Sequence, residues 1–213
     1  MAMPRTDRLI DHWKPILPFM IAGLTGCATL PRTAPLRPVH TLAVSPQVEI
    51  ERPRLMNPLI LFGLVGVVVG EVAAHSDAKR LGSGLAAAPK SLADVLREEF
   101  TTQVSQSGRF QVVDSEKADA LAALAITELS LGNPFFELRE RPMVTIQLTI
   151  SDRSGQGLWR GTARVNNLDN RTPLYDHDTY VEKSEVAFEA YSIAIRVAVS
   201  DLVKHLATEP PDA

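Results

Sequence analysis

An alternating pattern in the second half of the chain restricts its fold most. From 143 to 150 every second residue is apolar, as in a strand that buries one face. The turn-forming sequence DRSGQG at 152–157 follows, and 158–165 returns with Trp159 and Val165 as apolar residues. The two segments predict an antiparallel hairpin. Because the apolar face of this hairpin must be shielded from water, we expect helices or a second sheet to pack against it.

Other segments supply the remaining strands. Apolar residues at even spacing predict a strand over 41–50, in which Pro46 indicates a sheet edge or a bulge. A short strand is expected at 110–113. The alternation over 121–131 predicts a strand there, although its alanines also suit a helix.

Two long helices are expected to cover the sheet. Ser91 and Asp94 match a capping box, and Gly108 stands where a helix would end. The apolar face of this helix comprises Leu92, Val95, Leu96, Phe100 and Val104. A second amphipathic helix is predicted from about 182 to 206, with Phe188, Tyr191, Ile195, Val199, Leu202 and Leu206 on one face. The chain is therefore predicted to be α+β, with an antiparallel or mixed sheet of about five strands and two long helices on one face.

Residues 59–74 (LILFGLVGVVVGEVAA) form an apolar, glycine-rich segment with a single charge, Glu71. A helix of this length would measure about 24 Å, less than the roughly 30 Å of a bilayer core. The small-xxx-small spacing of Gly66 and Gly70 favours close helix packing. Candidate contacts with a membrane or partner are Leu59, Phe62, Gly63, Gly66 and Gly70. Burial against the protein's own sheet is an equally good interpretation, and 75–90 is expected to be a polar link.

The amino terminus has the layout of a secretory signal peptide. Arg5, Arg8 and Lys14 precede the short apolar run 16–22, and small residues follow. The run is too short for a membrane span. This layout predicts a signal peptide at 1–26 and a mature chain that begins at Cys27, the only cysteine.

Leu24-Thr25-Gly26-Cys27 resembles the bacterial lipobox. The resemblance implies a diacylglycerol on Cys27 and an acylated, palmitate-type amino terminus that anchors the protein in a membrane. Because Ala28 and not Asp follows, the resemblance to the sorting rule of enterobacterial lipoproteins implies the periplasmic face of the outer membrane. The alternative is that Cys27 is a small buried thiol.

The mature chain divides into three parts. Residues 27–40 contain three prolines and predict a lipidated cysteine with a flexible tether. A single periplasmic domain is expected over 41–208, and 209–213 is expected to be a disordered tail.

Three stretches also resemble a known group of proteins. They are SLADVLREEFTTQVSQSGRFQVVD, ADALAALAITELSLG and VTIQLTISDRSGQGLW, which cover roughly Ser91 to Trp159. They are similar to periplasmic lipoproteins related to the curli secretion channel subunit and to the amino-terminal domain of the Tol-system propeller protein. The resemblance implies a fold and not a catalytic site, and the paired pore-forming hairpins of the channel subunit are missing.

No pattern in the sequence indicates a reaction, cofactor or metal. A formal net charge of −3 gives no basic surface for nucleic acid. Asp176-His177-Asp178 is the one His–carboxylate cluster, and a solvated loop is favoured over a metal site. The alternating charges of Glu137, Arg139, Glu140 and Arg141 are typical of a solvated rim. The adjacent pair Phe135 and Phe136 fits core packing better than a contact point.

Two classes of function remain, and an enzyme is not expected. The first is a lipid-anchored structural or assembly protein that works by protein–protein contact or self-association in the envelope. The second is a binding module that carries an apolar ligand such as lipid, which a wide apolar cleft beside 59–74 would favour.

Overall fold

The structure, a computed structural model, describes residues 39–50, 54–55, 76–134 and 137–208. The predictions for the signal peptide, the lipobox, the apolar segment 59–74, the pair Phe135 and Phe136, and the tail lie outside these residues. No helix of the described part is both long and apolar enough to cross a bilayer.

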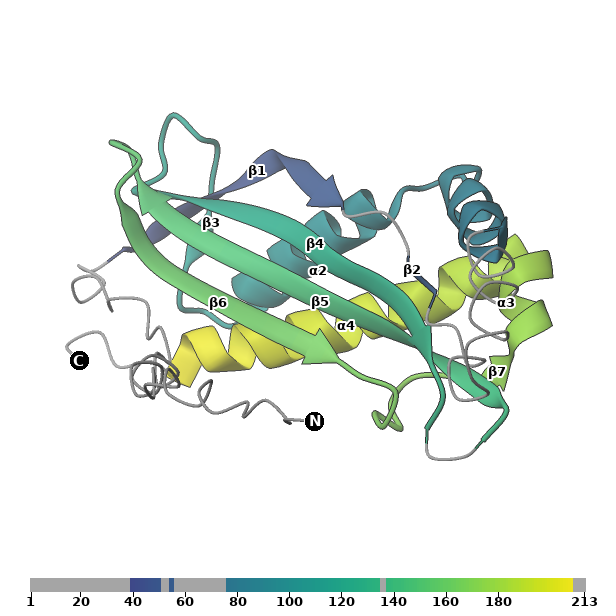
Figure 1. Cartoon of the computed structure of the whole chain (residues 1–213). Coiled ribbons are helices and arrows are strands. Elements are labelled where there is room, and N and C mark those ends of the chain that lie inside the picture. The colour runs from purple at the N-terminus through teal and green to yellow at the C-terminus, as the bar shows by residue number, and fades with distance from the viewer. Residues whose placement is uncertain (1–38, 51–53, 56–75, 135–136, 209–213) are drawn as a thin grey trace, which may run out of the picture. The chain divides into compact units, whose positions relative to one another are not determined.

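A mixed sheet forms the centre of the domain, with strand order β3-β1-β4-β5-β6 (Figure 1). β1 lies parallel to β3 and β4, whereas β4, β5 and β6 are antiparallel neighbours. The main strands are β1 (Thr41–Ile50), β3 (Gln111–Val112), β4 (Ala120–Gly132), β5 (Arg139–Asp152) and β6 (Gly157–Val165). Two short strands extend it, since β2 (Arg54–Leu55) pairs with β4 and β7 (Tyr175–Asp176) pairs with β5. The hairpin and the strand reading of 121–131 are confirmed.

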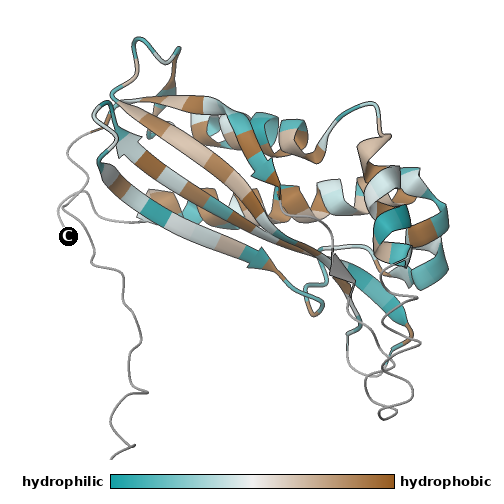
Figure 2. Cartoon of the chain, turned by 45° about the horizontal axis from the view of Figure 1, so that its top comes forward, coloured by the Kyte–Doolittle hydropathy of each residue, from teal (hydrophilic) through white to brown (hydrophobic). Residues whose placement is uncertain are grey.

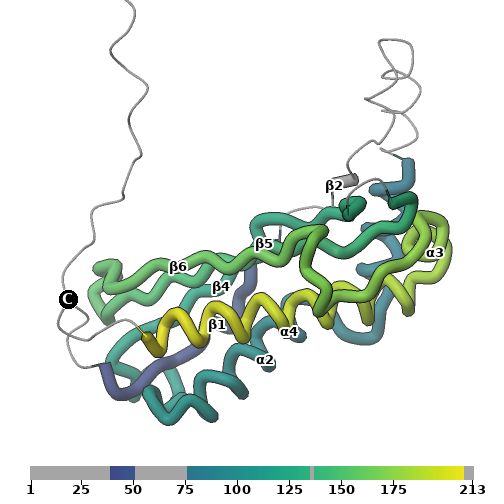
Figure 3. The backbone as a smooth tube through the Cα atoms, turned by 90° about the horizontal axis from the view of Figure 1, so that it is seen from below, coloured from purple at the N-terminus to yellow at the C-terminus, as the bar shows by residue number. Residues whose placement is uncertain are grey.

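Two long helices, α2 (Leu92–Gln106) and α4 (Ser184–Thr208), pack on one face of the sheet (Figure 3). The Ser91 Oγ accepts a hydrogen bond from the Asp94 N–H at 3.1 Å, as expected of the amino-terminal cap. Gly108 follows the helix with φ +67°, a left-handed conformation that glycine adopts without strain. The fold class is therefore α+β, as predicted.

The two faces of the sheet differ in polarity. Val144, Ile146, Leu148 and Ile150 are fully buried beneath the helices, and they are the four residues whose spacing predicted β5. The residues between them, on the opposite face, are two threonines and a glutamine. Figure 2 shows the resulting bands of alternating hydropathy along the strands. In β5 one face therefore belongs to the core and the other, open face is polar, whereas in β4 the exposed positions include the apolar residues Leu121 and Ala123.

Both outer regions of the sheet carry features that discourage further strand pairing. At β1 the register with β4 shifts between Val44 and Val48, which confirms the bulge expected at Pro46. The Arg97 guanidinium donates a hydrogen bond to the Pro46 carbonyl at 3.3 Å. Proline has no N–H, so this part of β1 offers a poor template for a further strand. At β6 two exposed arginines, Arg160 and Arg164, project from the open face.

The domain has two distinct ends. At the tether end, Asp119 accepts hydrogen bonds from the backbone N–H groups of His40 and Thr41 at 3.2 and 2.9 Å, which fixes the point where the chain enters β1. At the opposite end β4 finishes at Gly132 and β5 begins at Arg139. We call it the insertion end, because residues 56–75 connect β2 there to a helix at 76–86.

Two segments differ from the sequence predictions. Residues 76–86 are helical and not a polar link, because Leu81 and Leu85 lie one helical turn apart and are both buried. Around 176–178, where the sequence favoured a solvated loop, the structure has β7 and the helix α3 (His177–Glu182). The fully buried Tyr180 holds α3 against the domain.

Candidate functional site

None of the predicted site residues lies within the described part of the chain. This holds for the lipobox residues Leu24, Thr25 and Gly26 with Cys27, and for the candidate contacts Leu59, Phe62, Gly63, Gly66 and Gly70. The structure does describe the two points that flank 56–75. Leu55 of β2 pairs with Leu131 of β4, and the helix at 76–86 begins nearby, so both anchor points belong to the insertion end.

His177 connects these anchor points to the sheet. Its Nδ1 lies 2.9 Å from Glu140 Oε2 at the start of β5, and its Nε2 lies 3.3 Å from Asp77 Oδ2 in the helix at 76–86. The hydrogen bond to Glu140 raises the pKa of His177 to about 9, despite the opposing effect of partial burial. His177 is therefore a cation at neutral pH. It bridges a buried carboxylate and a helix that directly follows the apolar segment.

Both imidazole nitrogens of His177 are engaged by carboxylates, so neither is available as a general base. No group of three His, Cys, Asp or Glu side chains in the described ranges has the arrangement of a metal site. The cluster of Asp77, Glu140 and His177 joins structural elements by charge pairing.

Two buried tyrosines secure the same region. Tyr180 Oη donates to the carbonyls of Glu140 and Pro173 at 3.2 and 3.3 Å. Tyr191 Oη donates to the carbonyl of Ser130 at 3.0 Å. Burial raises the pKa of both tyrosines, so both remain neutral and act as hydrogen-bond donors.

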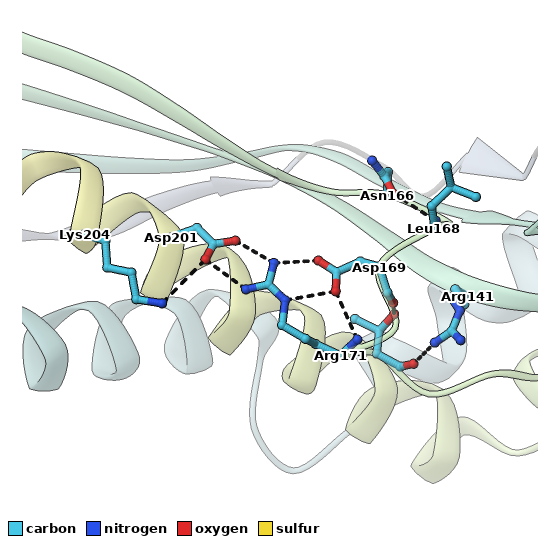
Figure 4. Close-up of polar contacts among 8 residues, drawn as sticks. Arg141, Asn166, Leu168, Asp169, Arg171, Asp201 and Lys204 are labelled. Atoms are coloured by element: carbon cyan, nitrogen blue, oxygen red, sulfur yellow. Dashed lines mark hydrogen bonds and ion pairs between the residues drawn. The ribbon is translucent and has the colours of Figure 1, made fainter.

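An arginine clamp holds the loop between β6 and β7 against α4 (Figure 4). Arg171 forms ion pairs of 2.7 Å with Asp169 in the loop and with Asp201 in α4. Nearby, the Arg141 guanidinium donates to the Thr172 carbonyl. The Asn167 side chain donates to the Asn133 carbonyl at 2.5 Å, which ties this loop to the turn between β4 and β5.

Apolar and charged side chains are exposed around this scaffold. Leu138 is 92% exposed, Leu168 51% and Tyr175 39%, and all three lie at the insertion end. Exposed carboxylates come from Asp176, Asp178 and Glu182. Two further exposed charges, Lys79 and Arg80, lie on the helix at 76–86.

The interpretations of two charged segments were wrong. Glu140 is 4% exposed and belongs to β5, so the segment 137–141 is not simply a solvated rim. His177 opens α3 and pairs with two carboxylates, so 176–178 is not a solvated loop. The sequence did contain a signal for the burial of Glu140. Glu140 is separated from Val144 and Ile146 by an even number of residues along the strand, so its side chain lies on the same, helix-covered face of β5.

A separate groove of about 520 Å³ lies between β1, β3 and α2, toward the tether end. Its lining includes Val44, Val112 and Leu121 together with the charged residues Arg97 and Asp114. The lining of this groove is therefore mixed, and the cleft expected beside 59–74 lies outside the described residues.

Comparisons with known proteins do not assign a family to the chain. No family model matches it, and no curated protein matches it. Among solved structures it is similar to a DUF330 family protein from Xanthomonas campestris, with 12% identity, 81% of this chain and 83% of that chain covered, and a TM-score of 0.43. A minor lipoprotein from Acinetobacter baumannii has 13% identity, covers 79% and 89%, and gives a TM-score of 0.37. The PelC dodecamer from Paraburkholderia phytofirmans has 15% identity, covers 78% and 92%, and gives 0.31. At these scores the likenesses transfer no function.

Proposed function

We propose that the protein is a lipid-anchored structural or assembly protein on the periplasmic face of a bacterial outer membrane. It works by protein–protein contact in an envelope complex and catalyses no reaction. The observation that carries the proposal is the sequence Leu24-Thr25-Gly26-Cys27 at the end of a segment with the layout of a signal peptide. The resemblance of 91–159 to periplasmic lipoproteins of envelope machines supports the same assignment.

The architecture of the insertion end fits a contact role. The cluster of His177, Glu140 and Asp77 fixes the helix that follows residues 56–75. Pairing with β4 fixes β2, the strand that precedes them. A segment held at both ends can present apolar side chains to a partner while the domain behind it stays folded. The residues that we propose for this contact are Leu59, Phe62, Gly63, Gly66 and Gly70.

Mass spectrometry of the native protein tests the anchor. The expected product is a chain that begins at an acylated Cys27 and that fractionates with outer membranes. A Cys27→Ser variant should instead retain its signal peptide or appear unacylated in the soluble fraction. An unmodified Cys27 with residues 1–26 still attached would contradict the proposal.

Replacing Gly66 and Gly70 with leucine tests the contact segment. Leucine keeps the segment apolar but prevents close helix packing, so the assembly size in detergent should fall while the domain remains folded. Replacing Val67 and Val68 with leucine is a control that leaves the glycine spacing intact. If assembly size is unchanged in the glycine variant, the segment serves the protein's own core or the lipid phase.

A further inference from the structure

We infer that the insertion end is a self-association surface, on which the basic helix at 76–86 of one copy meets the acidic helix α3 of a second copy anchored in the same membrane. This deepens the proposed function by naming the partner and the surface. The membrane setting rests on the proposed lipid anchor, whereas the contact itself can be measured without it.

The first observation is a set of opposite charges without partners. Lys79 and Arg80 are exposed on the helix at 76–86, and Asp178 and Glu182 are exposed on α3. Within the described ranges none of the four forms a hydrogen bond or ion pair, although Asp77 and His177 join these same two helices. Each copy therefore presents both halves of a complementary pair. Because the two helices lie side by side in each copy, a two-fold dimer satisfies both charge pairs at once, whereas a contact repeated in one direction builds a ring or a chain of copies.

The second observation is the apolar surface beside these charges. Asn133 connects Leu138 and Leu168, because its side chain donates to the Leu138 carbonyl at 3.3 Å and its own carbonyl accepts from Asn167. Tyr175 pairs with Glu140, two residues after Leu138 along the chain. Exposed apolar groups bordered by charges are the composition of a protein interface with a polar rim.

The position of the tether favours a second copy, and not the anchoring bilayer, as the partner of the insertion end. The tether joins the domain at Thr41, at one end of the sheet. The 13 residues of β4 span up to about 40 Å from there to the insertion end. The 14 residues 27–40, which the sequence predicts to be a flexible tether, would have a mean reach of only about 20 Å. Folding the insertion end back to the membrane would stretch the tether toward its full length. Tethers of equal length instead place the insertion ends of neighbouring copies at the same distance from the membrane, where they can meet.

Features of β1 and β6 disfavour association through strand pairing at these two edges of the sheet. The Pro46 bulge and the Arg97 hydrogen bond interrupt the edge of β1. At β6, an antiparallel partner centred on Thr162 would place Arg160 opposite Arg164 of the second copy, and like charges at that spacing repel. Self-association is thereby directed to the insertion end.

Charge reversal tests the contact on the full mature protein in detergent, by sedimentation velocity over a range of protein concentrations. One variant carries Lys79→Glu and Arg80→Glu, the other Asp178→Lys and Glu182→Lys, and a quadruple variant combines them. The control for the first variant is Lys117→Glu with Lys204→Glu, which makes the same change in charge at exposed positions outside the insertion end. Tryptophan fluorescence melts confirm that each variant is folded.

We expect each reversal to weaken association roughly tenfold or more, the control to leave it unchanged, and the quadruple variant or a mixture of the two reversals to restore it. Mass spectrometry of Cys27 reports separately on the proposed anchor. A wild-type protein that stays monomeric overturns the inference, as does an assembly that is insensitive to the reversals or one that the control disrupts equally. A reversal that is not rescued by its complement also overturns it.

Discussion

Replacing His177 with alanine should destabilise the protein in a manner that depends on pH. In the folded protein the pKa of His177 is about 9, against 6.5 for an ordinary histidine. At 1.36 kcal/mol per pH unit this difference corresponds to roughly 3 kcal/mol. Because the side chain is 35% exposed, solvent screening reduces the contribution to about 1–2 kcal/mol.

The sign follows from the direction of the pKa change. A histidine whose folded pKa lies above its unfolded pKa gives its full stabilisation below pH 6.5, and the stabilisation is lost as pH rises toward about 9. His177→Ala also leaves the buried Glu140 carboxylate without its cation. We therefore expect a total loss of about 3 kcal/mol near pH 6 and a difference from wild type that shrinks by about 1–2 kcal/mol by pH 9.5.

Thermal unfolding followed by tryptophan fluorescence provides the assay. Of the two tryptophans, Trp13 lies in the predicted signal peptide, so the mature protein reports through Trp159 alone. For a chain of this size, about 3 kcal/mol corresponds to a fall in Tm of roughly 6–12 °C. His40→Ala removes an exposed histidine at the tether end and is the control. A loss of stability that is equal at pH 6 and pH 9.5 would refute the reasoning.

Three further substitutions test the packing, each measured by the same melt. Gly161→Ala should cost about 1–3 kcal/mol, because its Cβ would lie 2.0 Å from the Trp159 ring, whereas Gly157→Ala has no atom within 4 Å and is the control. Tyr191→Phe should cost about 1–2 kcal/mol, since it removes the hydrogen bond to the buried Ser130 carbonyl; an unchanged Tm would mean that this bond contributes nothing. Ser91→Ala should cost about 1 kcal/mol through loss of the helix cap, and Ser91→Thr should recover most of it.

Much of the fold could be predicted from local patterns. The period of two in 143–150 and the cap at Ser91 both describe interactions between residues near each other in the sequence, and both are confirmed. The helix at 76–86 was missed because Gly82 and Gly84 obscure the spacing of Leu81 and Leu85.

The polar cluster at the insertion end could not be predicted in the same way. His177 is 37 residues from Glu140 and 100 residues from Asp77. Only the pairing of β7 with β5 and the burial of Tyr180 bring these groups together. Local sequence placed Asp176-His177-Asp178 in solvent because it contains no apolar residue, whereas tertiary contacts decide its environment.

The interrupted edge of β1 has a consequence for crowding. Proteins held on a membrane by lipid are confined to two dimensions, where neighbours meet far more often than in solution. An intact parallel edge would let sheets of adjacent molecules merge into a growing ribbon. Pro46, which cannot donate a hydrogen bond, and Arg97, which occupies its carbonyl, end such growth at its first step. With the proposed lipid anchor, many copies of this domain could then share one membrane without aggregation through β1.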